Sequence, residues 1–259
     1  NDLDFGGDVH GTNGPISCVR PKREDWLPAQ TAFYDACRSA GFPDCPDHNL
    51  PDSTGVGPLA FNNVNNVRIS TAIGYLADIR HRLNLTIRAD SRAHRIIIEN
   101  GRAVGVVVES GGERFEVRAG EVIVSAGAVV SPQLLMLSGI GPASHLEDHG
   151  IKVIADIPGV GQNLQDHPKV FVVWSTVPDY EFDFERNRLQ LALRYTANES
   201  HERNDMAVYM DGISTGRFDR GGVAKKPIGV EMNLVLHSAD SRGEIRLNST
   251  DVTDQPMID

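Results

Sequence analysis

The sequence contains little cysteine. Its only cysteines are Cys18, Cys37 and Cys45, and no two of them form a C-x-x-C pair. This odd number argues against a disulfide framework and favours free thiols in a reducing compartment. A single disulfide, or a ligand set with His48, stays open as an alternative. Because no second cluster at a useful spacing would complete a ligand shell, we expect no metal.

The sequence also lacks an excess of positive charge. Its 35 acidic residues outnumber 25 Lys and Arg, for a formal charge of −10. Neutralising phosphates needs a basic face, and the sequence has no Lys/Arg cluster to build one. We therefore expect no nucleic-acid partner and no binding to an anionic membrane surface.

No uninterrupted apolar run is long enough to predict a membrane span. The most apolar window, residues 122–141, is broken by Ser, Gly, Pro and Gln, and is better explained as a buried strand, a tight turn and a helix. The chain does not open on a basic region followed by an apolar one, so no secretory signal is predicted. These features lead us to expect a cytoplasmic protein that is not bound to membranes.

Three glycine-rich stretches resemble a phosphate-binding loop only by letter. They begin at Gly55, Gly139 and Gly159. A pyrophosphate needs backbone N–H groups at the start of a helix that follows a strand. None of the three stretches has that setting, so we predict ordinary loops.

Hydrophobic periodicity and turn residues predict a mixed architecture. Asn100-Gly101, between β-branched runs, is the best hairpin signal and predicts a three-stranded meander over 94–118. The predicted helices are 27–40, 131–138 and 184–195. Further strands are expected at 121–125, 170–176, 229–237 and 244–247. Ala126 and Gly127 follow the 121–125 strand and would let a ligand approach the backbone closely, although a packing turn would also explain them.

One string carries a family resemblance. Residues 127–141, GAVVSPQLLMLSGIG, match the second signature of the glucose–methanol–choline (GMC) oxidoreductases position by position. Further family landmarks follow in order across nearly the whole chain: His10-Gly11, Gly14-Pro15, Arg68-x-Ser70, Asn84-Leu85, 102–106, 158–168 and 241–243. The sequence thus resembles a GMC oxidoreductase.

The resemblance implies an enzyme that uses FAD to oxidise a small-molecule alcohol, with hydride transfer from the CH–OH group to flavin N5. Two alternatives stay open. One is a non-redox enzyme on the same scaffold, of the hydroxynitrile lyase or photodecarboxylase type. The other is a non-catalytic fragment that binds no FAD.

Two family features are not found in the sequence. The strand–GxGxxG–helix unit that holds the ADP half of FAD does not precede residue 1, and the catalytic His pair would lie beyond Asp259. We therefore expect an internal fragment whose missing portions are part of a longer chain or separate chains. The isolated chain is expected to be inactive and not to retain FAD, and its catalytic residues are unknown.

The resemblance also assigns six cofactor-binding residues. A backbone contact to the FAD adenine maps onto Ala93, where the family usually has Val. Ser125, Ala126 and Gly127 correspond to the lining of the cofactor groove. The loop containing Asn163 and His167 corresponds to one that the family packs close to the flavin.

The expected fold is α/β plus α+β. It combines part of a FAD-binding Rossmann-like domain that carries the β-meander with an antiparallel-sheet substrate domain. The predicted segments are 1–59 on the substrate side, 60–168 in the FAD-binding domain and 169–259 in a truncated substrate-binding domain.

Overall fold

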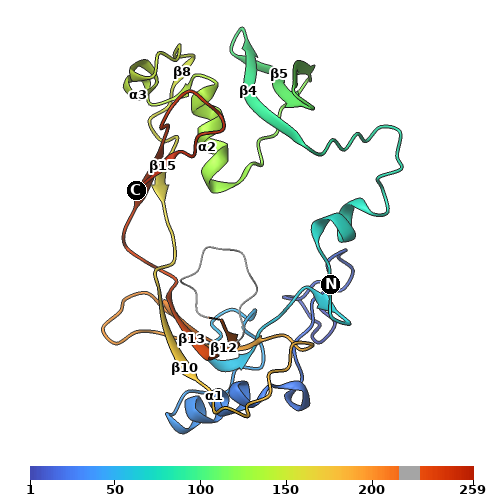
Figure 1. The fold of residues 1–259 in the computed structure, drawn as a ribbon, viewed down its shortest axis with the longest axis vertical. Coiled ribbons are helices and arrows are strands. Elements are labelled where there is room, and N and C mark those ends of the chain that lie inside the picture. The colour runs from blue at the N-terminus through green and yellow to red at the C-terminus, as the bar shows by residue number, and fades with distance from the viewer. Residues whose placement is uncertain (216–227) are drawn as a thin grey trace. The chain divides into compact units, whose positions relative to one another are not determined.

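The chain folds into two compact units, each assembled from separate segments. The computed structural model describes residues 1–215 and 228–259 (Figure 1). Unit 1 combines 1–85 with 166–239, and unit 2 combines 86–165 with 240–259. The predicted boundaries were 59/60 and 168/169. Whether the units correspond to a substrate side and a cofactor side stays a prediction.

Unit 1 is built on a five-stranded antiparallel sheet with strand order β1-β11-β12-β13-β10. Its strands are β1 (Gly55–Pro58), β10 (Lys169–Ser175), β11 (Leu189–Tyr195), β12 (Met206–Ser214) and β13 (Gly229–Leu236). The predicted strands at 170–176 and 229–237 are confirmed. Shorter elements are a 3₁₀ turn (Arg23–Asp25), β2 (Asn63–Val64), β3 (Val67–Arg68) and a π-helical turn (Ala72–Leu76).

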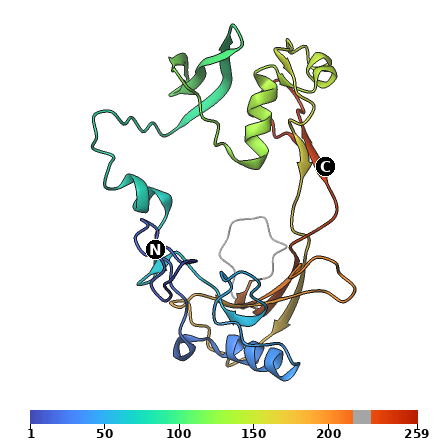
Figure 2. The same cartoon turned by 180° about the vertical axis from the view of Figure 1, so that it is seen from behind.

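Helix α1 (Pro28–Ser39) covers one face of this sheet, across β12, β11 and β1 (Figures 1 and 2). Pro28 suits the first helical turn because that position has no intrahelical N–H partner. Phe33 and Cys37 are buried against the sheet. The sheet contributes Val56, Leu191, Leu193, Val208 and Met210 to the same core. Burial of these apolar side chains fixes the helix to the sheet.

Unit 2 contains the predicted meander, which is confirmed. Strands β4 (Ser91–Glu99), β5 (Arg102–Ser110) and β6 (Glu113–Arg118) pair antiparallel in that order. Asn100 and Gly101 join the first two strands with φ of 51° and 75°. Positive φ at both turn residues gives the twist that a two-residue hairpin needs.

The remainder of unit 2 surrounds helix α2 (Gly127–Leu137). Its other elements are β7 (Ile140–Gly141), α3 (Ala143–Asp148), β8 (Ala155–Asp156), β9 (Gln162–Leu164), β14 (Gly243–Arg246) and β15 (Met257–Ile258). Met136 and Leu146 are fully buried and pack with Ile245 and Leu247. The backbone N–H of Ile96 donates to Ser138 Oγ at 2.8 Å, which ties the end of α2 to β4.

Three sequence predictions are wrong. The first is the predicted helix at 184–195, of which residues 189–195 form strand β11 instead. This strand lies between β1 and β12, and its pairing with them outweighs the helix propensity of its Leu and Ala residues. Residues 121–125 form no strand, since no described segment pairs with them, and Ile123 is 81% exposed. Two of the predicted glycine-rich loops contain strands, since Gly55–Pro58 is β1 and Ile140–Gly141 is a short strand, β7.

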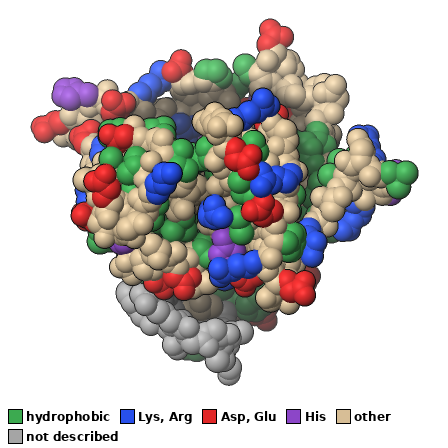
Figure 3. Space-filling view, turned by 90° about the horizontal axis from the view of Figure 1, so that it is seen from above, with side chains coloured by type: hydrophobic (Ala, Val, Ile, Leu, Met, Phe, Trp, Pro, Cys, Tyr) green, Lys and Arg blue, Asp and Glu red, His purple; other side chains and the backbone are tan. Residues whose placement is uncertain are grey.

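The described surface is consistent with the acidic composition. On the face shown in Figure 3, acidic and basic side chains are interspersed. Within residues 1–215 and 228–259, none of the helices has both the length and the apolar character to cross a bilayer.

Candidate functional site

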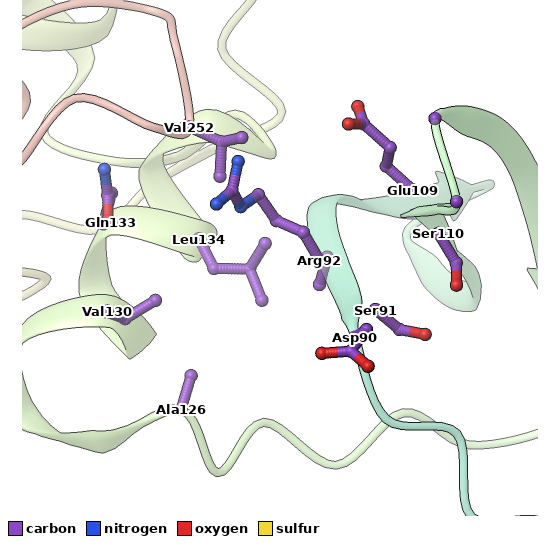
Figure 4. Close-up of a pocket in the computed structure, with 13 residues that line it drawn as sticks. Asp90, Ser91, Arg92, Glu109, Ser110, Ala126, Val130, Gln133, Leu134 and Val252 are labelled. Carbon is purple, nitrogen blue, oxygen red and sulfur yellow. The ribbon is translucent and has the colours of Figure 1, made fainter.

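Unit 2 contains an open cavity of about 680 Å³ between the meander and α2 (Figure 4). Figure 4 shows Asp90, Ser91 and Arg92 on one side and Ala126 and Val130 on the other. The complete lining is Asp90, Ser91, Arg92, Ala93, Glu109, Ser110, Gly111, Gly112, Ala126, Val130, Gln133, Leu134 and Val252. This volume lies in the range of small-molecule sites.

The paired strands β4 and β5 form the first wall of the cavity. Ala93 lies opposite Val108, and Arg92 lies opposite Glu109. The strands end at this point, and Gly111 and Gly112 turn the chain with φ of 61° and 82°. Because these glycines carry no side chain, the wall near them consists of backbone, to which a planar ligand can come close.

The start of α2 supplies the opposite wall. Ala126 precedes the helix, and Gly127 begins it with a φ of 89°. A Cβ placed on Gly127 would have no heavy atom within 4 Å, so the space beside it is open. The Ala126 N–H donates to Ser131 Oγ at 3.1 Å, and Gln133 Nε2 donates to the Asp254 carbonyl at 2.8 Å. The first bond closes the turn at the start of the helix, and the second joins the helix to the 249–254 loop.

Charged side chains of both signs surround the cavity. Glu109 Oε2 lies 2.9 Å from both His94 Nε2 and Arg114 Nε. The hydrogen bond from Arg114 lowers the pKa of Glu109 against the opposing effect of desolvation, and His94 lowers it further. Arg92 extends from β4 toward Leu134 and Val252 (Figure 4). Because Glu109 is already paired with Arg114, the lining keeps Asp90 and Arg92 as charges of opposite sign, and a lining without net charge suits an uncharged planar group.

The six residues assigned by sequence are distributed over three places. Ala93 and Ala126 line the cavity together, and Ser125 and Gly127 flank Ala126 in the chain. Asn163 lies outside the lining, in the bulged strand β9, with a φ of 63°. His167 belongs to unit 1.

Sequence reasoning missed most of the lining. Val130, Gln133 and Leu134 lie on the first turns of α2 and could have been deduced from helical spacing after Ala126. The meander over 94–118 was predicted, but the place of its Gly111-Gly112 turn at a cavity was not. Val252 comes from a distant segment, and no local pattern in the sequence indicates its position.

Polar clusters elsewhere in the described chain show no metal-ligand geometry. Within residues 1–215 and 228–259, no group of three or more His, Cys, Asp or Glu side chains could hold a metal ion. All three cysteines are free. Cys45 Sγ lies 3.5 Å from His48 Nδ1, and the pKa of the Cys45 thiol is raised, mainly by burial.

The most buried ionic cluster lies in the N-terminal part of unit 1. His10 is held between Asp2 and Asp47, with N···O distances of 3.1 and 2.9 Å. Arg20 pairs with the same two carboxylates at 2.9 and 2.6 Å. All four side chains are at most 6% exposed, so each buried charge has a partner of opposite sign. This arrangement joins three loop segments and explains His10 as a structural residue.

Fold, motif order and sequence similarity together define the class of protein. Residues 12–169 match the sequence profile of the GMC oxidoreductases. The chain belongs to the GMC oxidoreductase family.

Two curated relatives illustrate the similarity. The chain is 38% identical to a Rhodococcus erythropolis protein described as an uncharacterized GMC-type oxidoreductase, over 99% of this chain and 50% of that protein. It is 45% identical over 62% of its length to an oxygen-dependent choline dehydrogenase of Brucella canis, of which it covers 29%. The chain thus spans half or less of these relatives.

Solved structures share the same fold. Pyridoxine 4-oxidase from Mesorbium loti superposes with a TM-score of 0.82 at 27% identity, over 97% of this chain and 50% of that one. A FAD-dependent oxidoreductase from Chaetomium thermophilum gives a TM-score of 0.80 at 20% identity, over 98% and 54%. At that identity, the second similarity indicates the fold alone.

Proposed function

We propose that the cavity of unit 2 holds the adenosine end of FAD in a longer flavoenzyme that oxidises an alcohol. One observation carries this proposal. Ala93 and Ala126, assigned to cofactor binding from separate segments, line the same cavity. Membership of the GMC oxidoreductase family supports the cofactor.

The residues present fit an adenosine. Val130 and Leu134 offer apolar side chains for the faces of a purine, while the backbone around Ala93 and Gly112 offers hydrogen-bonding groups at its edge. Ser91 and Asp90 supply polar groups suited to ribose hydroxyls. A lining whose charges offset one another suits the uncharged nucleoside end of the cofactor.

Bound FAD would supply the hydride acceptor for the oxidation of an alcohol CH–OH group. The contribution of this chain is to position the cofactor. The backbone wall at Ala93 and the small residues 125–127 would fix the nucleoside while excluding water from its apolar faces.

Adenosine binding to the 259-residue chain tests the proposal. In an isotope-labelled sample, we expect adenosine to shift the amide resonances of Ala93, Gly112 and Ala126. FMN carries the flavin and one phosphate but no adenine, and it should leave these resonances unchanged. Equal responses to both probes, or adenosine shifts confined to unit 1, would overturn the assignment.

Two glycine variants distinguish a loss of adenosine affinity caused by filling the cavity from one caused by backbone strain. Gly127→Val places a branched side chain in the open space beside Ala126, and we expect adenosine affinity to fall at least tenfold. Gly150→Val is the control, because Gly150 also has a positive φ of 68° and nothing within 4 Å of a Cβ, yet lies outside the cavity. Unchanged adenosine affinity in Gly127→Val would contradict the proposed function.

A further inference from the structure

A second cavity, of about 460 Å³, lies on the five-stranded sheet of unit 1. Its lining is His167, Lys169, Arg188, Leu189, Tyr209, Asp211, Asn233, Val235 and His237. Lys169 pairs with Val235, and Tyr209 pairs with Asn233, so strands β10, β12 and β13 all contribute. Val208 and Met210, the neighbours of Tyr209 in β12, pack in the core with α1. Since side chains alternate along a strand, the cavity is on the sheet face opposite α1.

An ordered aromatic array forms part of the cavity. Tyr209 Oη and His237 Nε2 are 3.1 Å apart, and the His237 ring stacks on His167 with centroids 4.7 Å apart. Burial lowers the pKa of His237, and His167, Arg194 and Lys169 lower it further. Burial also raises the pKa of Tyr209. The phenol oxygen and the imidazole nitrogen are thus within hydrogen-bonding distance of one another at the floor of the cavity.

The charged lining has a net excess of one positive charge. Arg188 Nε lies 3.5 Å from Asp211 Oδ2, so these two charges offset one another. Lys169 makes no ion pair within the described parts of the chain, and its ammonium is one of the charges that act on His237. A ligand that enters this cavity thus meets flat aromatic rings and one uncompensated cation.

We propose that this cavity selects an alcohol substrate carrying a carboxylate, which Lys169 pairs with while the aromatic array packs against the rest of the molecule. That the substrate is an alcohol rests on the proposed function. That the cavity prefers a negatively charged substrate rests on the side chains of unit 1 alone. A single carboxylate matches the single excess positive charge. A dianionic phosphate would leave one negative charge beside Asp211, and a quaternary ammonium would be repelled by Lys169.

Three probes of similar size but different charge test this preference on the 259-residue chain. They are 4-(hydroxymethyl)benzoate, neutral benzyl alcohol, and choline. We expect 4-(hydroxymethyl)benzoate to bind roughly tenfold more tightly than benzyl alcohol, with resonance shifts at Tyr209 and His237, and choline to bind most weakly. Tighter binding of choline, or displacement of the benzoate by an equal concentration of inorganic phosphate, would overturn the proposal.

Lysine variants tie the preference to one residue. Lys169→Gln should bring the affinity for 4-(hydroxymethyl)benzoate down to that for benzyl alcohol, and Lys169→Arg should restore most of the difference. Lys152→Gln, at an exposed position in unit 2, should change neither affinity. If Lys169→Gln keeps the full preference with an unchanged melting temperature, Lys169 does not select the substrate.

The two binding experiments, one with adenosine and one with the charged alcohols, can fail independently. Adenosine shifts without a carboxylate preference would leave the cofactor site standing and refute only the substrate class. A carboxylate preference without adenosine shifts would keep the charge-selective cavity and refute the FAD assignment.

Discussion

The meander of unit 2 and the five-stranded sheet of unit 1 differ in how far along the chain their strands find partners. In unit 2, each strand of the meander pairs with the next one in sequence, across two-residue turns. In unit 1, β1 at residues 55–58 pairs with β11 at 189–195, and among the described strands β10 pairs only with β13. Local pairing costs little loop entropy, whereas distant pairing must be stabilised by burial. Unit 1 therefore depends on its core, and the meander depends on its turns.

The largest expected effect comes from the core of unit 1. Leu191 is fully buried in β11, and Leu191→Ala should lower the stability of unit 1 by about 3 kcal/mol. Hydrogen exchange read by mass spectrometry should show lost protection in β1 and β12 but not in β4–β6. Met136→Ala, which truncates an equally buried residue of unit 2, should give the reverse pattern. If either variant loosens both units equally, the chain unfolds as one unit and the comparison fails.

A smaller effect is expected from the buried ionic cluster of unit 1. Asp2→Asn removes one charge that Arg20 and His10 both contact, and should cost about 2 kcal/mol at pH 7, measured by urea unfolding. Asp8→Asn, at an exposed position, is the matched control and should be nearly neutral. Equal stability of Asp2→Asn and Asp8→Asn would show that the cluster does not stabilise the N-terminal loops.

The same variant has a defined pH dependence. Burial alone would raise the pKa of Asp2, but the N–H groups of Asp4 and Phe5 and the Arg20 guanidinium outweigh it and lower the pKa below the ordinary 3.8. A carboxylate with a lowered folded-state pKa stabilises the fold above about pH 3.8, and that stabilisation disappears as the pH falls through the lowered value. The stability difference between the unmodified chain and Asp2→Asn should therefore persist at pH 5 and shrink below pH 3.8.

The smallest effect tests the turns of unit 2. Gly101 has a φ of 75° and open space around it, so Gly101→Ala introduces backbone strain without a clash and should cost about 1 kcal/mol. Gly120 has the same open space but no positive φ, and Gly120→Ala should be neutral. The urea midpoint of unit 2 measures both. A neutral Gly101→Ala would mean that the meander does not depend on this turn.

The contrast between local and distant pairing also explains which elements could be predicted. The Asn100-Gly101 turn and the flanking Val and Ile residues contain enough information to predict β4 and β5. The run Leu189–Tyr195 is rich in helix-forming residues, and only its buried position between β1 and β12 makes it a strand. Strand β12 was missed because its polar surroundings resembled loops.

The candidate site was predictable to a similar extent. Ala126 and Gly127 were found because a small-residue turn before a helix has a recognisable pattern, and Ala93 followed from family motif order. Arg92 was not identified, since an Arg at the start of a strand is usually solvated. Val252 lies in the segment between β14 and β15, and β14 pairs with β9, a contact between distant segments that a single sequence does not reveal.

The interleaving of the two units sets an order for their formation during synthesis. The ribosome releases residues 91–118 as one continuous stretch, so the meander can form as soon as it emerges. The sheet of unit 1 must wait, because the one described strand that pairs with β10 is β13, which ends at Leu236. Until then β10 has no partner, and its Val170 and Val173, 65% and 42% exposed even in the finished fold, are open to other strands. Residues 169–175 are thus the stretch of this nascent chain where a chaperone would be most useful.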